Sequence, residues 1–424
     1  MKILIKGGRV IDPANNLDEV IDILIDNSKI SKVAKNIRNG VEQTIDASGK
    51  IVMPGLIDMH VHLRQPGRED KETLASGTAA AVHGAVTSVL AMPNTSPAMD
   101  SPQAISLLKD IIKSDARNNV FICAAITKGR KGEELVDIAR LKKEGAIAIS
   151  DDGASVEDAS LMLEAFRRSR KAGMLVVCHC EDKSLSNGGV VNHGFNSTRL
   201  GLRGITNESE HKRIARDIEL ADKAKAAVHI AHVSCKESVE IIRQAKKKGI
   251  AVTCETAPHY FTLTDESVLN YDTNYKMNPP LRGREDVEAI RKGLSDGTID
   301  CIASDHAPHT ESEKEIEFDR AEFGIVGLET ELSLSITELI EGKVLTWPQL
   351  VDKLAYKPAK ILGINRGSLG AGSAADVIIV SADTQWQVKK EDFCSKSKNS
   401  PFIGRILAGV VEYTICNGKI VYSR

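Results

Sequence analysis

The sequence is poor in aromatic residues and has no strong net charge. Aromatic residues make up 4% of the 424 residues, and 56 basic residues nearly balance 58 acidic ones, for a net charge of -2. Nucleic-acid-binding proteins rely on clustered positive charge, and often on aromatic side chains that stack on bases. The composition therefore argues against a nucleic-acid partner.

The sequence also lacks long apolar runs and paired cysteines. No run approaches the roughly 18 apolar residues that a membrane-spanning helix needs. The first residues, MKILIKGGRVID, turn polar too soon for a signal peptide. The eight cysteines form no CxxC pair, and most lie in apolar, strand-like runs, which is typical of buried, reduced thiols. We expect a soluble, cytoplasmic protein with no membrane association.

One pattern recurs through the middle of the chain: a basic helix end, a glycine and then an apolar strand. It is found in LKKEG-AIAIS, SRKAG-MLVVCH, AKKKG-IAVTCE and LSDG-TIDCIASD, and a looser copy is AVHG-AVTSVLAM. Glycine is favoured directly after a helix because it adopts the left-handed conformation easily. These glycines are Gly84, Gly145, Gly173, Gly249 and Gly297.

The apolar runs that follow the glycines are short and nearly continuous, as in parallel strands buried on both faces. Between them lie helical segments, such as residues 103–115 and the segment after Val233, where Ser234 and Glu237 have capping-box spacing. Eight strands are expected, over residues 52–58, 86–92, 120–127, 146–150, 174–179, 227–232, 250–255 and 299–304.

Eight strand–helix units predict an α/β fold of the (β/α)8 TIM-barrel type, over residues 52–363. A doubly wound open sheet is the alternative. The flanks, residues 1–51 and 364–424, contain short strands with turn signals. We expect both chain termini to build one small β-sandwich domain. The segment KKEDFCSKSKNSPF, residues 389–402, is predicted to be an exposed loop.

Histidines and one aspartate mark the ends of several predicted strands. His60 and His62 in DMHVHLRQPG are two residues apart, so in an extended chain they point to the same side. His179, His232 and Asp305 end the fifth, sixth and eighth predicted strands. Barrel enzymes place their active sites at this end of the strands, and His and Asp are zinc ligands. The pattern predicts a metal site.

These motifs resemble those of the metal-dependent cyclic amidohydrolases within the amidohydrolase superfamily. In particular, DMHVHLRQPG, AMPNT, SDDG, HCED, HVS, MNPPLRG and SDHAPHT are similar to the motifs of dihydroorotases of the longer bacterial type (class I). The resemblance covers essentially the whole chain. It implies reversible, zinc-dependent hydrolysis of dihydroorotate to N-carbamoyl-L-aspartate, a step of de novo pyrimidine (UMP) biosynthesis.

The resemblance also implies roles for the strand-end residues. His60 and His62 would hold one zinc ion, and His179 and His232 a second. Asp305 would be both a metal ligand and the catalytic residue that takes a proton from the attacking water and passes it to the departing nitrogen. The expected cofactor is one or two zinc ions per subunit.

Two adjacent aspartates follow the fourth predicted strand, in AIAISDDGAS at residues 146–155. Many superfamily members bridge two metals there with a carboxylated lysine, and this sequence has no lysine at that position. Strand alternation places Asp152 on the side of the small residues that would line the barrel, and Asp151 on the side of the isoleucines. We therefore expect Asp152 to bind metal, and Asp151 to be a turn residue or to support the ligands from behind.

Four more residues are implied to bind the substrate. Arg64, Asn94 and His309 would bind its carboxylate, to which Arg in particular offers a planar pair of donors, and Asn278 would contact the ring. Residues 310–324 are charged and are expected to form a mobile loop near the site.

Other functions remain open. An allantoinase or hydantoinase would use the same metal ligands on another cyclic amide. Some dihydroorotase-like chains are catalytically silent partners of aspartate transcarbamoylase, and the complete set of predicted ligands argues against silence but not against such a partnership. We expect the substrate to be a small molecule and the protein to form a homo-oligomer.

Overall fold

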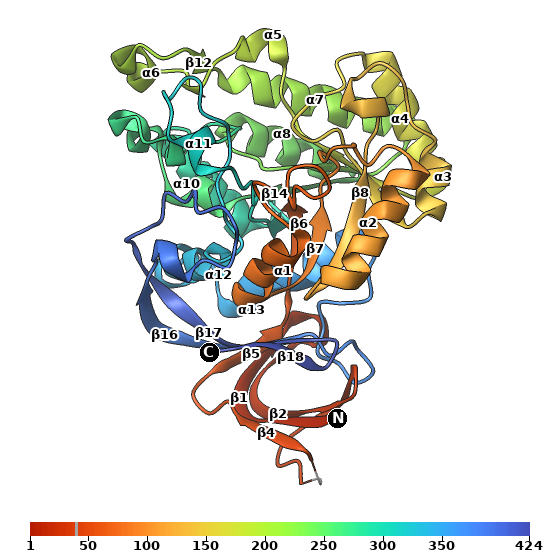
Figure 1. Cartoon of the computed structure of the whole chain (residues 1–424), viewed down its shortest axis with the longest axis vertical. Coiled ribbons are helices and arrows are strands. Elements are labelled where there is room, and N and C mark those ends of the chain that lie inside the picture. Colours follow the sequence, from red (N-terminus) through yellow and green to blue (C-terminus); the bar gives the residue numbers. More distant parts are fainter. Residues whose placement is uncertain (39–40) are drawn as a thin grey trace.

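The computed structural model describes residues 1–38 and 41–424 and shows a barrel joined to a sheet built from both chain termini (Figure 1). The barrel strands are parallel and hydrogen-bond in chain order. His62 N donates to His306 O at 2.9 Å, which brings the last strand back to the first. The prediction of a (β/α)8 barrel is therefore confirmed, and the alternative of a doubly wound open sheet is wrong. The strands are β6 (Leu56–Val61), β7 (Val86–Ala91), β8 (Asn119–Ala124), β9 (Ala146–Ile149), β10 (Leu175–Cys178), β13 (Val228–Ile230), β14 (Val252–Thr256) and β15 (Cys301–Ile302).

Helices surround the barrel, as Figure 1 shows for α2, α4, α7 and α8. The helix expected over residues 103–115 is present and buries Ala104, Ile105 and Leu108 against the barrel. The main helices are α1 (Leu74–His83), α2 (Pro102–Asp115), α3 (Ile138–Lys143), α4 (Ala159–Ala172), α7 (Asn207–Ala224), α8 (Lys236–Lys247), α10 (Arg284–Asp296), α12 (Glu331–Ser335), α13 (Trp347–Val351) and α14 (Lys357–Leu362). Two π-helical segments, Ile336–Glu341 and Asp352–Tyr356, continue α12 and α13.

Shorter elements lie in the connections between strands and helices. The link from β10 to α7 holds α5 (Lys183–Ser186), β11 (Val191–Asn192), α6 (Phe195–Leu200) and β12 (Gly204–Ile205). Two short α-helices, α9 (Pro258–Thr262) and α11 (Glu311–Lys314), follow β14 and β15. Short 3-10 helices are formed by Pro13–Asn15, Lys128–Arg130, Asp265–Asn270, Thr273–Tyr275 and Lys390–Asp392.

The terminal strands form one mixed sheet, in which β5 and β1 link the C-terminal strands to the N-terminal ones. Apolar residues from both termini, including Ile3, Ile23, Val377 and Ile415, share a single core. Both termini thus contribute strands to one continuous mixed sheet, as expected for a small β domain built from the two ends of the chain. Its strands are β1 (Lys2–Asp12), β2 (Leu17–Asp26), β3 (Lys29–Ala34), β4 (Gln43–Asp46), β5 (Ile51–Pro54), β16 (Val377–Gln387), β17 (Ile406–Cys416) and β18 (Lys419–Ser423).

The first expected barrel strand, over residues 52–58, is in fact two strands. β5 pairs with β1 and β16 of the terminal sheet, and β6 begins the barrel after Gly55. A Cβ atom at Gly55 would lie 2.2 Å from the Thr87 side chain. The chain therefore passes from one sheet to the other at a point where only glycine fits.

Two local predictions need correction. Gly145, Gly173 and Gly249 have positive φ as expected, but Gly84 has φ -83° and Ala85 takes the left-handed conformation instead. Gly84 is required for a different reason, because a Cβ there would lie 2.0 Å from a backbone oxygen of the segment before α12.

The start of α8 also differs from the prediction. Cys235, and not Ser234, is the residue before the helix, and it provides no side-chain cap. Ser234 instead donates from its backbone and its hydroxyl to the buried carboxylate of Glu210. The capping-box spacing was therefore misleading here.

The segment predicted as an exposed loop, residues 389–402, is exposed over residues 389–392, but from Phe393 on buried residues alternate with exposed or partly buried ones. It connects β16 to β17 and runs beside the barrel, and we call it the arm (Figure 1). Ser395, Ser397, Asn399 and Ser400 are all buried. All eight cysteines are free, and all except Cys394 on the arm are buried, largely as expected. None of the described helices is long and apolar enough to cross a membrane.

Candidate active site

The predicted metal ligands of the first strand lie beside Asp305 at the mouth of the barrel. His60 lies in β6 and His62 directly after it, while Asp305 follows β15. Asp305 Oδ1 is 3.4 Å from His62 Nε2 and 3.7 Å from His60 Nε2. All three side chains are buried. The structure therefore brings these three donors to one point.

A second pair of histidines faces the same space from neighbouring strands. His179 follows β10 and His232 follows β13, and His179 Nδ1 is 2.8 Å from His232 Nε2. The same two nitrogens lie 3.7 Å and 3.8 Å from Asp152 Oδ1. The donor set thus continues across the mouth of the barrel.

Asp152 lies between the two histidine pairs. Its Oδ1 is 3.2 Å from His60 Nε2, and its Oδ2 is 3.4 Å from His62 Nε2. Asp151 points elsewhere: its Oδ1 accepts hydrogen bonds from the backbone N–H groups of Ile126 and Thr127 at 2.8 and 3.1 Å. The two adjacent carboxylates therefore have different surroundings, one among the histidines and one in the turn.

This arrangement fits a divalent metal. His60 Nε2 and Asp152 Oδ1 are buried, and neither has a hydrogen-bond partner within the described parts of the chain. Unsatisfied buried polar atoms are costly, so such atoms in a native site point to a missing partner. Imidazole nitrogens and carboxylate oxygens are the donors that zinc prefers when cysteine is absent.

Two further residues orient the histidines of the first pair. His60 Nδ1 is 2.8 Å from Glu255 Oε1, and His62 Nδ1 is 2.8 Å from Asn94 Oδ1. Carboxylate and amide oxygens accept, so each Nδ1 carries the hydrogen and each Nε2 is left free for a metal. Burial alone would raise the pKa of Glu255, but the hydrogen bonds from His229 and His60 lower it to about 2.

The electrostatics favour an ionised Asp305. Burial would raise the pKa of its carboxyl group, but the surrounding histidines, His62 first, lower the pKa well below its usual range. His232 and Asp305 have positive φ angles of 36° and 49°. Such strained backbone is concentrated at functional sites in proteins.

The predicted substrate-binding residues line one cavity at this mouth, with a volume of about 260 Å³. Arg64 Nε donates to Pro308 O at 3.1 Å, and burial lowers the pKa of Arg64 to about 10, so its guanidinium stays charged near neutral pH. Asn278 Nδ2 donates to Glu181 Oε2 at 3.2 Å. The residues brought together here are Arg64, Asn94, Asn278 and His309, together with Asp152 and Asp305.

His309 is neutral and held on both sides. Lys71 Nζ donates to its Nδ1 at 3.0 Å, and its Nε2 donates to Phe323 O at 2.8 Å. Burial and the nearby charges of Arg64 and Lys71 lower the pKa of His309 to about 2. Phe323 also lines the cavity, so the expected loop of residues 310–324 does lie beside the site.

The comparisons with known proteins agree with this geometry. A family model described as "Dihydro-orotase-like" matches residues 49–238. A dihydroorotase of Geobacter metallireducens is 52% identical over 426 residues, covering 100% of both chains, and one of Elusimicrobium minutum is 51% identical, covering 99% of this chain and 97% of its own. This chain belongs to the dihydroorotase family.

Solved structures show the same fold as this member of the dihydroorotase family. An L-hydantoinase (dihydropyrimidinase) from Arthrobacter aurescens superposes with a TM-score of 0.90 at 26% identity, covering 99% of this chain and 96% of that chain. A dihydropyrimidinase from Brevibacillus agri, at 24% identity, has a TM-score of 0.88 over 100% of this chain and 95% of its own, and this likeness concerns the fold alone.

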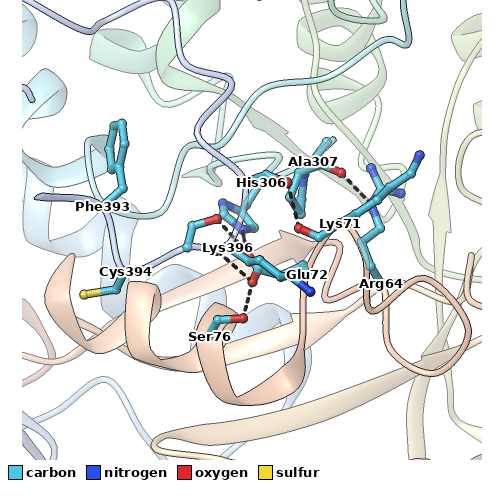
Figure 2. Close-up of polar contacts among 12 residues, drawn as sticks. Arg64, Lys71, Glu72, Ser76, His306, Ala307, Phe393, Cys394 and Lys396 are labelled. Carbon is cyan, nitrogen blue, oxygen red and sulfur yellow. Dashed lines mark hydrogen bonds and ion pairs between the residues drawn. The ribbon is translucent and has the colours of Figure 1, made fainter. Parts of the chain in front are cut away.

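Sequence reasoning missed how the arm of this dihydroorotase family member supports the site. Glu72 accepts hydrogen bonds from Ser395 Oγ and Lys396 N of the arm and lies 3.4 Å from His306 Nε2 (Figure 2). Asn399 Oδ1 accepts from His309 N at 3.1 Å. The serines and lysines of the arm gave no apolar signal from which this burial could be predicted.

Glu255 was also missed. It lies within the short strand β14, among residues that look like any buried strand, and no motif pointed to it. Its one sequence signal is a carboxylate inside an otherwise apolar or weakly polar run, which is unusual because buried carboxylates need partners.

Proposed function

We propose that this chain catalyses the reversible hydrolysis of dihydroorotate to N-carbamoyl-L-aspartate at a zinc centre of one or two ions, within de novo pyrimidine synthesis. The observation that carries the proposal is the convergence of six buried donors at the mouth of the barrel. The names of the full-length relatives support the choice of substrate. The six donors are His60, His62, Asp152, His179, His232 and Asp305.

Each residue has a definite task in this proposal. His60 and His62 would hold one ion and His179 and His232 a second, and Asp152, which lies between the two pairs, would contribute its carboxylate to the centre. When bound, zinc lowers the pKa of a coordinated water toward about 7 and polarises a carbonyl group. The protein supplies the buried, oriented donors that make this possible.

Asp305 is the proposed proton carrier. Hydrolysis adds a water oxygen to the ring carbonyl carbon and breaks the bond from that carbon to the ring nitrogen. Asp305, which is ionised, takes a proton from the attacking water and delivers it to the departing nitrogen, so that the atoms balance. Cyclisation follows the same path in reverse.

The substrate carboxylate is proposed to bind beside Arg64. The guanidinium is charged, Asn94 and His309 line the same cavity, and Lys71 adds a further buried positive charge behind His309. Asn278 would contact the ring. The charged guanidinium of Arg64 at this end of the cavity favours a cyclic amide that carries a carboxylate over a neutral one.

A hydantoinase or allantoinase is the second candidate, because the fold is shared with an L-hydantoinase (dihydropyrimidinase). Turnover of dihydroorotate, hydantoin, dihydrouracil and allantoin by the zinc-loaded protein distinguishes the candidates. We expect dihydroorotate to have by far the highest kcat/KM. A preference for a neutral ring would assign the second function instead.

We further propose that the chain acts in the cytoplasm as a homo-oligomer and that aspartate transcarbamoylase is a candidate partner. Sedimentation of the purified protein tests the first association. Co-purification with aspartate transcarbamoylase from the same cells, followed by activity measured with and without it, tests the second. A monomer that is fully active alone would contradict both.

A further inference from the structure

Glu255 joins the proposed metal ligand His60 to another buried histidine, His229. Glu255 Oε1 is 2.8 Å from His60 Nδ1, and Glu255 Oε2 is 3.2 Å from His229 Nε2. Glu255 is 1% exposed, and both histidines are 0% exposed. The three side chains therefore form a chain of contacts that is closed to solvent.

This contact decides which nitrogen of His60 carries the hydrogen. A neutral imidazole has one N–H, and a carboxylate can only accept, so the hydrogen is on Nδ1. The other nitrogen, Nε2, keeps its lone pair and faces Asp152 Oδ1 at 3.2 Å. His60 is thus held in the tautomer that binds a metal through Nε2.

The far end of the chain of contacts is also fixed. His229 lies in β13 and Thr253 opposite it in β14, and His229 Nδ1 is 2.8 Å from Thr253 Oγ1. Because the His229 Nε2 hydrogen is donated to Glu255, Nδ1 accepts from the threonine hydroxyl. Both oxygens of the carboxylate therefore accept hydrogen bonds, which keep it oriented toward His60.

We propose that Glu255 is a positioning residue for the metal centre, which fixes the tautomer and ring orientation of His60 while His229 holds the carboxylate in place. This inference rests on the metal centre of the proposed function. Loss of such an outer hydrogen-bond partner commonly costs about 10- to 100-fold in metal affinity or activity.

Two substitutions test the proposal. Glu255→Leu removes the acceptor. Glu255→Gln keeps one carbonyl oxygen for His60 and can donate its NH2 to His229 Nε2, because His229 can take its other tautomer and donate from Nδ1 to the Thr253 hydroxyl. The affinity of the metal-free proteins for Zn²⁺ is measured by competition with a chromogenic chelator. The visible absorption of the Co²⁺-loaded proteins reports the ligand geometry.

We expect Glu255→Leu to bind Zn²⁺ at least about 10-fold more weakly and to change the Co²⁺ spectrum. Glu255→Gln should recover most of both properties. Wild-type affinity in the leucine variant would overturn the proposal. If that variant does not fold, Glu255→Asp replaces it: its shorter side chain cannot reach both histidines, so it should weaken Zn²⁺ binding, and unchanged binding would equally overturn the proposal.

Glu331→Gln is the matched control. Glu331 is 1% exposed, and neither of its carboxyl oxygens has a hydrogen-bond partner among the residues that the structure describes. Burial, with the charges of Asp58 and Glu255, raises the pKa of Glu331 well above its usual value, so the neutral amide is a close substitute. Its Zn²⁺ affinity should match the wild type, and a loss equal to that of Glu255→Leu would contradict a specific role for Glu255.

These measurements use no substrate, which separates the two proposals. A wild-type protein that binds zinc but does not hydrolyse dihydroorotate would defeat the proposed reaction and leave the role of Glu255 standing. Equal zinc affinity in the wild type and Glu255→Leu would defeat the role of Glu255 and leave the reaction standing.

Discussion

The side-chain oxygen of Asn94 lies 2.8 Å from Nδ1 of His62, so the same amide meets a proposed metal ligand and lines the substrate cavity. Because Oδ1 must accept from His62, the NH2 group is the part left for the substrate. We therefore propose that Asn94 links metal binding to recognition of the substrate carboxylate.

This relationship predicts that two substitutions of Asn94 behave differently. Asn94→Asp still accepts from His62, so zinc affinity should be kept, but the added negative charge repels the substrate and KM for dihydroorotate should rise at least about 10-fold. Asn94→Leu should lose zinc affinity as well, by about 10-fold. Chelator competition and steady-state kinetics measure both. Equal zinc affinities in the two variants would contradict the link.

Asp152 and Asp151 should respond differently to alanine. Asp152→Ala is expected to lower the zinc content and activity strongly with little loss of stability, because it removes the carboxylate among the histidines. Asp151→Ala should instead lower the free energy of unfolding by about 2–3 kcal/mol, since it leaves the buried N–H groups of Ile126 and Thr127 without their acceptor. Metal analysis and chemical denaturation test the pair, and identical behaviour would refute the assignment.

Asp305→Asn should lower kcat for dihydroorotate by about 100-fold or more, because the amide cannot carry the proton. The four histidines and Asp152 remain, so most of the zinc should stay bound. Kinetics and metal analysis on the same preparation check both statements. Near-normal kcat in a zinc-loaded variant would exclude Asp305 as the proton carrier.

Lys71→Met should raise KM for dihydroorotate more than it lowers kcat. The substitution removes the donor to His309 Nδ1 and one buried charge near Arg64, while the metal ligands are untouched. Lys353→Met is a suitable control, because Lys353 is also buried but donates to Ile299 O instead of a cavity residue. A similar rise of KM in both variants would show that the effect comes from general loss of stability.

The barrel and the convergence of the proposed metal ligands could be predicted because both follow from spacing along the chain. A glycine after several of the helices and a short apolar run locate the strands, and parallel strands place their ends at one mouth. Strand alternation separated Asp152 from Asp151 for the same reason.

The contacts behind the site could not be predicted in this way, because they join residues that are far apart in sequence. Glu255 meets His60 across 195 positions, and Glu72 meets the arm at Ser395 across 323. The arm is polar in composition, and its serines and Asn399 are buried where the barrel supplies hydrogen-bond partners. No local pattern carries that information.

The most direct test of the whole account is zinc-dependent turnover of dihydroorotate. The purified protein is stripped of metal with a chelator and titrated with Zn²⁺, while bound zinc and the rate of N-carbamoyl-L-aspartate formation are measured together. We predict that activity vanishes on stripping and returns in proportion to bound zinc, up to one or two ions per chain. Full activity in the stripped protein, or none at any zinc occupancy, would contradict the account.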